Sequence, residues 1–90
     1  IIKKNMEIVM IKKQGCMPCE QFEPEARKMA KEHSIGFRTI PMEIMPVKMI
    51  PPFFPYFHLM EGKELLESWG GVKDRKFLSV IKRNTKKDEE

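Results

Sequence analysis

Long hydrophobic runs are missing from this sequence of 90 residues. A helix needs about 20 consecutive apolar residues to cross a bilayer, and no stretch of the chain approaches that length. We therefore expect no membrane span and no membrane partner. The basic start at Lys3 and Lys4 precedes only a short apolar stretch, which Glu7 interrupts, and this is unlike a secretory signal. The sequence predicts a cytoplasmic protein.

The chain also lacks a large excess of one charge, since the formal net charge is only +4. Nucleic-acid-binding proteins usually carry a stronger and more clustered basic excess, so we expect no nucleic-acid partner. Basic residues gather near the end, where Asp88–Glu90 follow them, and such a mixed run is typical of a solvated tail. A chain this short makes one small domain. We expect a monomer with a domain over residues 1–84 and a frayed charged tail over residues 85–90.

Cysteine is scarce as well, because Cys16 and Cys19 are the only two. Two cysteines are too few for a disulfide scaffold, and without an export signal their default state is reduced and reactive. Such a pair can close a disulfide, hold a metal or exchange with other disulfides. His33 has a zinc-finger-like separation from Cys19, but His58 lies too far along the chain to complete that site. We expect no metal.

The segments around the cysteines predict a strand followed by a helix. A β-rich run, Met6–Lys13, comes before them, and residues 17–34 follow with a helical period. One face of that helix holds Phe22, Ala26, Met29, Ala30 and His33. Glu23 and Arg27 are four residues apart, which predicts a surface ion pair. A Cys-x-x-Cys motif at a strand–helix junction is typical of intracellular redox proteins.

The helix start favours thiolate chemistry at the first cysteine. The first N–H groups of a helix have no partners within it, and they favour negative charge together with the helix dipole. Such positions lower the pKa of a cysteine from about 8.5 to roughly 3.5–7.5. Cys16 is therefore expected to be the exposed nucleophile, and Cys19, about one turn further in, the resolving thiol. Pro18 suits the first helical turn, and Gly15 permits a tight turn before Cys16.

The rest of the chain predicts one more strand, a hairpin and a helix. Gly36 is expected to end the first helix. The segments that follow are a β-rich run (Phe37–Ile44), a proline-rich link (Met45–Phe54), a hairpin with its turn at Gly62 and Lys63 (56–69), and a last helix capped by Asp74. Several methionines are expected to fill the core, namely Met42, Met45, Met49 and Met60.

This order of elements, with Cys-x-x-Cys opening the first helix, resembles the thioredoxin superfamily. Pro18 stands before the second cysteine and Pro24 five residues after it, as in thioredoxins. The pair Phe54-Pro55 is similar to the family's cis-proline site, which faces the cysteines. Gly62 and Gly70 match the glycines of the hairpin turn and the substrate groove. The match covers roughly Met6 to Arg83. It implies an α/β protein with a minimal thioredoxin fold, in which a four-stranded mixed sheet (β-α-β, then β-β-α) is flanked by two or three helices.

The chain departs from the family pattern in several places. The usual extra strand and helix before the first strand are absent from this sequence, and the third helix is largely missing. Gly15 replaces the usual aromatic residue before the first cysteine, and Met10 replaces the buried acid that helps to move the proton of the second cysteine. His58 and Glu43 are the candidates for a replacement proton shuttle.

The resemblance implies thiol–disulfide oxidoreduction on protein disulfides, catalysed by Cys16 and Cys19 without a bound cofactor. A reductase or glutathione would recycle the Cys16–Cys19 disulfide. The residues expected to contact substrate are Met17, Pro18, Phe54, Pro55, Trp69 and Gly70.

Two other functions remain open. A glutaredoxin-like, glutathione-dependent reductase fits the short length but not the dipeptide Met17-Pro18. A thioredoxin-fold binding module would use a face made of Phe53–Phe57 and Trp69, with vestigial thiols. Trp69 lies beside a glycine pair and suits core packing and groove lining equally.

Overall fold

The computed structural model describes residues 5–85. Its elements in chain order are β1 (Met6–Lys12), α1 (Met17–Glu32), β2 (Gly36–Pro41), the short 3₁₀ turns η1 (Met42–Ile44) and η2 (Val47–Met49), β3 (Tyr56–Glu61), β4 (Glu64–Gly70) and α2 (Asp74–Thr85). None of the helices in this part of the chain is long and apolar enough to cross a membrane.

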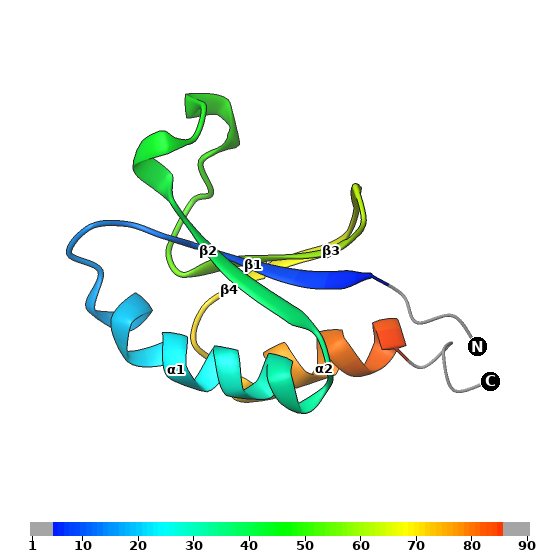
Figure 1. Ribbon diagram of the computed structural model, residues 1–90. Coiled ribbons are helices and arrows are strands. Elements are labelled where there is room, and N and C mark those ends of the chain that lie inside the picture. Colours follow the sequence, from blue (N-terminus) through cyan, green and yellow to red (C-terminus); the bar gives the residue numbers. More distant parts are fainter. Residues whose placement is uncertain (1–4, 86–90) are drawn as a thin grey trace.

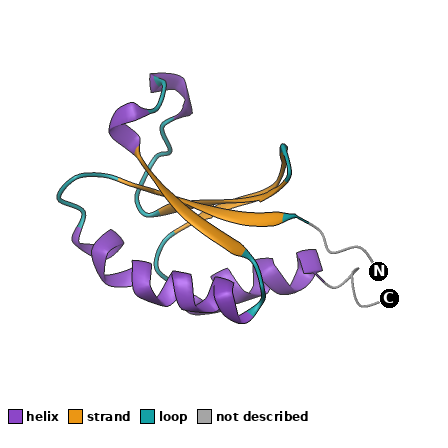
Figure 2. Ribbon diagram, in the orientation of Figure 1, coloured by secondary structure: helices purple, strands orange, loops and turns teal. Residues whose placement is uncertain are grey.

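The four strands form one mixed sheet in the order β2-β1-β3-β4. β1 runs parallel to β2 and antiparallel to β3, and β3 pairs antiparallel with β4. Both helices lie on one face of the sheet, and the segment with η1 and η2 rises on the other side (Figures 1 and 2). The predicted fold class, a four-stranded mixed sheet with β-α-β followed by β-β-α, is confirmed.

The core lies between the sheet and the two helices. Alternate residues of a strand point to opposite faces, and Met6, Ile8 and Met10 of β1 enter the main buried cluster. Its centre is aromatic. Phe57 stacks on Trp69 with ring centroids 5.4 Å apart, and Phe77 meets both rings edge-on. From the sequence, Trp69 suited core packing and groove lining equally; in the structure it is a core residue.

Several predicted boundaries differ from the structure. The first helix ends at Glu32, and Ser34 adopts a left-handed backbone with a φ of 60°. The prediction that Gly36 ends this helix is wrong, because Gly36 pairs with Glu7 as the first residue of β2. β2 stops at Pro41, which lacks the N–H that a longer ladder needs. Asp74 is the first helical residue of α2, which continues through Thr85; residues 86–90 of the predicted tail lie outside the described residues.

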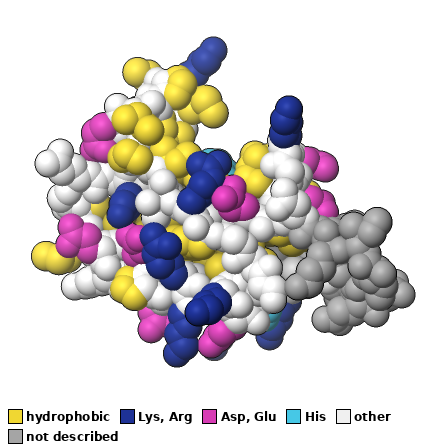
Figure 3. All heavy atoms as spheres, viewed as in Figure 1, with side chains coloured by type: hydrophobic (Ala, Val, Ile, Leu, Met, Phe, Trp, Pro, Cys, Tyr) yellow, Lys and Arg dark blue, Asp and Glu magenta, His cyan; other side chains and the backbone are white. Residues whose placement is uncertain are grey.

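The proline-rich link does not fill the core as its methionines predicted. Ile44, Val47 and Met49 are 74%, 86% and 60% exposed, and Figure 3 shows hydrophobic side chains gathered over this raised segment. Two 3₁₀ turns are too short to bury one face against the sheet. The methionines of the core are instead Met6, Met10 and Met29, which come from β1 and α1.

Candidate active site

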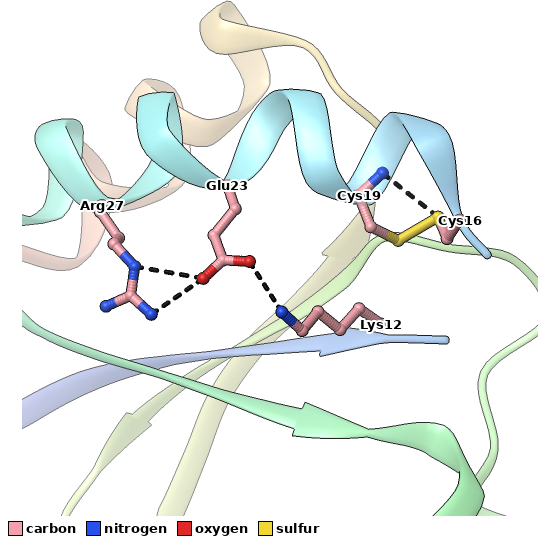
Figure 4. A network of polar contacts seen from close by, with 5 residues as sticks. All are labelled: Lys12, Cys16, Cys19, Glu23 and Arg27. Carbon is pink, nitrogen blue, oxygen red and sulfur yellow. Dashed lines mark hydrogen bonds and ion pairs between the residues drawn. A yellow bond between two sulfur atoms is a disulfide. The ribbon is translucent and has the colours of Figure 1, made fainter. Parts of the chain in front are cut away.

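The two cysteines lie where β1 passes into α1, as the sequence predicts. Gly15 adopts a φ of 76°, which confirms the tight turn before the helix. Cys16 is the N-cap residue of α1, and its Sγ accepts a hydrogen bond of 3.2 Å from the backbone N–H of Cys19. The two side chains form a disulfide with their Cα atoms 5.2 Å apart (Figure 4). Pro18 occupies the first helical turn.

The disulfide is more buried than the sequence suggested. Cys16 is 5% exposed and Cys19 is 1% exposed, so the expectation of an exposed Cys16 is wrong for the oxidised state. Both sulfurs belong to the main buried cluster. Met17 and Pro18 remain exposed beside them, and a shallow hollow of about 200 Å³ is lined by Pro18, Gln21, Phe22 and Val72.

The Phe54–Pro55 peptide bond is cis, as the sequence predicts. Pro55 is buried and directly precedes Tyr56, which pairs with Ile11 on one side and Gly70 on the other. The carbonyl of Pro55 accepts a 3.0 Å hydrogen bond from Gly71. Ile11 is the residue before the end of β1 at Lys12. The start of β3 and the end of β4, which align with Ile11, therefore lie at the same edge of the sheet as the cysteine loop. That Pro55 directly faces Cys16 stays a prediction.

Gly70 is fixed at this edge by two aromatic rings. A Cβ atom added to it would overlap the ring of Phe53 and come within 2.6 Å of Cδ1 of Tyr56. The sequence identified Gly70 through its resemblance to the groove glycine, and the structure adds this steric reason for the residue.

The proposed aromatic face of Phe53–Phe57 and Trp69 does not exist as one surface. Phe57 is fully buried and Trp69 is 5% exposed, whereas Phe53 is 51% exposed. Phe54 is half-buried, with the Lys13 ammonium 5.5 Å from its ring centre. The alternation of a strand explains the split, since Tyr56 and Phe57 must point to opposite sides. The binding-module hypothesis therefore loses the face on which it rested.

Met10, which takes the place of the buried acid, is fully buried in the cluster that holds both cysteines. His58 lies on the opposite side of β3 from Phe57, where its Nδ1 is 2.7 Å from Ser68 Oγ. Burial lowers the pKa of His58. Glu43 accepts a 3.0 Å hydrogen bond from the Gln14 N–H, and this bond lowers the pKa of the carboxyl group. Of the two candidates, only Glu43 contacts the cysteine loop.

A charged network that links the end of β1 to α1 was predicted only in part. Lys12 Nζ lies 2.8 Å from Glu23 Oε1, and Arg27 binds the other carboxylate oxygen through Nε and Nη2 at 3.2 and 2.8 Å (Figure 4). The hydrogen bond from Lys12 lowers the pKa of Glu23, and it does so against the opposing effect of burial. Helical spacing gave the Glu23–Arg27 pair, but the contact with Lys12 depends on how α1 packs over β1.

Residues 5–85 contain no group of three or more side chains placed to hold a metal ion. The cysteine pair is the reactive feature of this edge of the sheet, and it can cycle between a dithiol and a disulfide.

No protein-family model matches the chain, and no curated protein sequence matches it either. Several solved structures match the chain. Thioredoxin f2 of Chlamydomonas reinhardtii is 21% identical over 91% of this chain and 81% of its own, with a TM-score of 0.79. Thioredoxin 1 of Thermosipho africanus is 16% identical over 93% of this chain and 99% of its own, with a TM-score of 0.80. Thioredoxin f2 in a complex with ferredoxin:thioredoxin reductase is 13% identical over 90% and 78%, with a TM-score of 0.78.

These matches show that the chain has the thioredoxin fold. The fold that the sequence resemblance implied is therefore confirmed, with a Cys-x-x-Cys disulfide at the start of its first helix.

Proposed function

We propose that this protein is a thiol–disulfide oxidoreductase that reduces disulfides in protein substrates. One observation carries the proposal. Cys16 caps the N-terminus of α1 and is bonded to Cys19, and the Cys19 N–H donates to the Cys16 sulfur. That N–H and the helix dipole would stabilise a thiolate on Cys16 after reduction.

The reaction uses only the two sulfurs of the pair. The Cys16 thiolate attacks one sulfur of a substrate disulfide, forms a mixed disulfide and releases the other substrate sulfur as a thiolate. The Cys19 thiolate then attacks Cys16, and the second substrate sulfur leaves. The substrate gains two electrons and the protein keeps the Cys16–Cys19 disulfide. No bound cofactor is needed, because the dithiol carries both electrons.

Substrate contacts are proposed for the apolar rim around the disulfide. Met17 and Pro18 are exposed, and Phe54 and Gly70 are partly exposed at the same sheet edge. An extended peptide fits this rim, with the backbone before Pro55 available for pairing. Trp69 is buried beneath Phe57, so it supports the rim from the core side instead of touching substrate.

A reductase partner is the preferred route back to the dithiol. A structural neighbour is a thioredoxin f2 bound to ferredoxin:thioredoxin reductase, which supports a protein reductase over glutathione. We further propose that the protein is cytoplasmic, because reduced thiols are the default in that compartment. We also propose that it is a monomer.

The decisive experiment compares two cysteine variants in an insulin-reduction assay with dithiothreitol as the terminal reductant. Cys16→Ser should abolish reduction, because it removes the nucleophile. Cys19→Ser should trap a mixed disulfide between Cys16 and substrate, visible on non-reducing gels. Ser79→Ala on α2 is the control and should behave as the wild type, because the Ser79 hydroxyl bonds the Lys76 carbonyl within its own helix. Full activity in Cys16→Ser would overturn the proposal, and an adduct formed through Cys19 would reverse the two roles.

A further inference from the structure

The Lys12–Glu23 ion pair joins the end of β1 to α1 one helical turn beyond the second cysteine. Glu23 follows Cys19 by four residues, so their side chains project from the same side of α1. Lys12 is the last residue of β1, and Figure 4 shows its side chain running along the strand side of the disulfide toward Glu23. The side chains of Lys12 and Glu23 are 34% and 19% exposed. The pair is thus half-buried between strand and helix, on the side of α1 that also carries Cys19.

Cys19 lies in an apolar cluster, which does not favour its thiolate form. It is 1% exposed, and burial in apolar surroundings raises the pKa of a thiol. Met10, in the same cluster, can neither accept a proton nor offset a charge. A bare Glu23 carboxylate one turn away would oppose a thiolate on Cys19. The ammonium of Lys12 offsets that charge from the strand side, and the guanidinium of Arg27 offsets it from α1.

We propose that Lys12 and Glu23 are positioning residues that set the ionisation of the Cys19 thiol, and with it the rate at which the mixed disulfide is resolved. This inference rests on the proposed function. In the step concerned, Cys19 loses its proton to solvent and its thiolate attacks the Cys16 sulfur. The Cys16–Cys19 bond forms, the bond from Cys16 to the substrate sulfur breaks, and the substrate leaves as a thiolate.

Glu23 acts in this step through its charge and not as a base. Lys12 and Arg27 both bind its carboxylate, so it stays ionised at neutral pH and holds protons poorly. Lys12 is the positive member closest to the strand side of Cys19. The two residues should therefore have opposite effects on the thiol.

Other charged groups near this end of the fold are already engaged or point elsewhere. Lys13 lies over Phe54, and Glu43 binds the Gln14 N–H. On the side that faces α1, β3 and β4 place Phe57, Leu59 and Trp69 in the buried cluster. The remaining charged residues of the adjoining helix starts are exposed, and they are Glu20, Lys73, Asp74, Arg75 and Lys76.

The test measures the second step directly. The reduced protein reacts with Ellman's reagent, which leaves thionitrobenzoate on Cys16, and stopped flow follows its release by Cys19 across pH. Lys12→Gln should raise the pH midpoint of release by up to about one unit and slow release roughly threefold to tenfold at neutral pH. Glu23→Gln should lower the midpoint. Lys12→Arg keeps the charge and should keep the wild-type profile.

Glu67→Gln and Arg83→Gln are the matched controls, because they remove the same charges from another ion pair on β4 and α2. Neither should move the midpoint. Circular dichroism and thermal melting confirm that each variant is folded.

Three results would overturn the inference. Unchanged midpoints in folded Lys12→Gln and Glu23→Gln would show that the pair has no electrostatic effect. Slower release at every pH in Glu23→Gln would make Glu23 a base instead. Equal shifts in the Glu67→Gln and Arg83→Gln controls would show a non-specific charge effect. The proposed function fails separately, if the wild type itself does not reduce insulin.

Discussion

At the scale of single residues, the site follows two kinds of rule. Gly15, Cys16 and Pro55 obey local rules of turns, helix starts and strand starts, and the sequence predicted their places. Lys12 and Glu23 are eleven residues apart and meet only because α1 packs over β1. No periodic pattern links a strand end to the second turn of a helix. Sequence reasoning therefore found the sulfurs but missed the charges beside them.

Gly70 provides a residue-scale prediction about stability. Gly70→Ala would place a methyl group against the rings of Phe53 and Tyr56. Overpacking of this kind costs typically about 1–3 kcal/mol, and urea unfolding should report that loss. Moving Phe53 should also disturb the chain that leads into Pro55, so insulin reduction is expected to fall.

Gly36→Ala is the matched control for Gly70→Ala. Its Cβ would meet only ordinary contacts, the nearest being the Met6 carbonyl at 3.6 Å. Its stability should equal or slightly exceed that of the wild type, because alanine restricts the unfolded chain more than glycine does. If both variants lost the same stability, the ring contacts would not be the cause.

At the scale of elements, the sequence predicted which segments are helices and strands better than where they end. Ser34, and not Gly36, takes the left-handed backbone after α1. Glycine is the usual choice there, so a sequence rule favours Gly36. Register decides otherwise, because β2 must begin at Gly36 to pair with Glu7. Such a choice depends on the neighbouring strand and is invisible in the local sequence.

The pairing of β3 with β4 predicts a pH dependence of stability. Burial lowers the pKa of His58 from 6.5, and its Nδ1 is 2.7 Å from Ser68 Oγ. Below about pH 6.5 the unfolded chain binds more protons at His58 than the folded one does. The contribution of neutral His58 to the free energy of unfolding is therefore fully present above about pH 6.5. It should fall as the pH drops through that value toward the lower folded pKa. Urea unfolding at a series of pH values measures the slope.

His58→Gln should remove this slope, since an amide does not titrate. His33→Gln, at the C-cap of α1, keeps His58 and should therefore keep the slope. The carboxylates of Glu23 and Glu67 act in a separate range. Hydrogen bonds from Lys12 and Arg83 lower their pKa values from 4.5, so their stabilisation is lost only in more acidic solution. A slope that survives in His58→Gln would contradict the assignment.

At the scale of the whole molecule, the fold was predictable because the order of elements admits few arrangements. Parallel strands need a helical crossover, and the hairpin must be antiparallel. What the sequence did not reveal is which aromatic residues are buried. The run Phe53–Phe57 looks uniform in sequence, yet Phe53 is half exposed and Phe57 fully buried. Phe57 is buried because its side of β3 faces the two helices (Figure 1), whereas Phe53 lies before the strand begins.

Phe57 joins both helices to the sheet, since its ring contacts Phe22 of α1, Phe77 of α2 and Trp69 of β4. Phe57→Ala should therefore cost about 3–5 kcal/mol. Small domains have only about 5–15 kcal/mol in total, so this loss should leave the molecule near the limit of folding. Phe57→Leu keeps more volume and should remain measurable by urea unfolding, while Phe53→Ala should lose far less, because that ring is 51% exposed. Similar losses in Phe57→Ala and Phe53→Ala would mean that the aromatic cluster does not hold the two layers together.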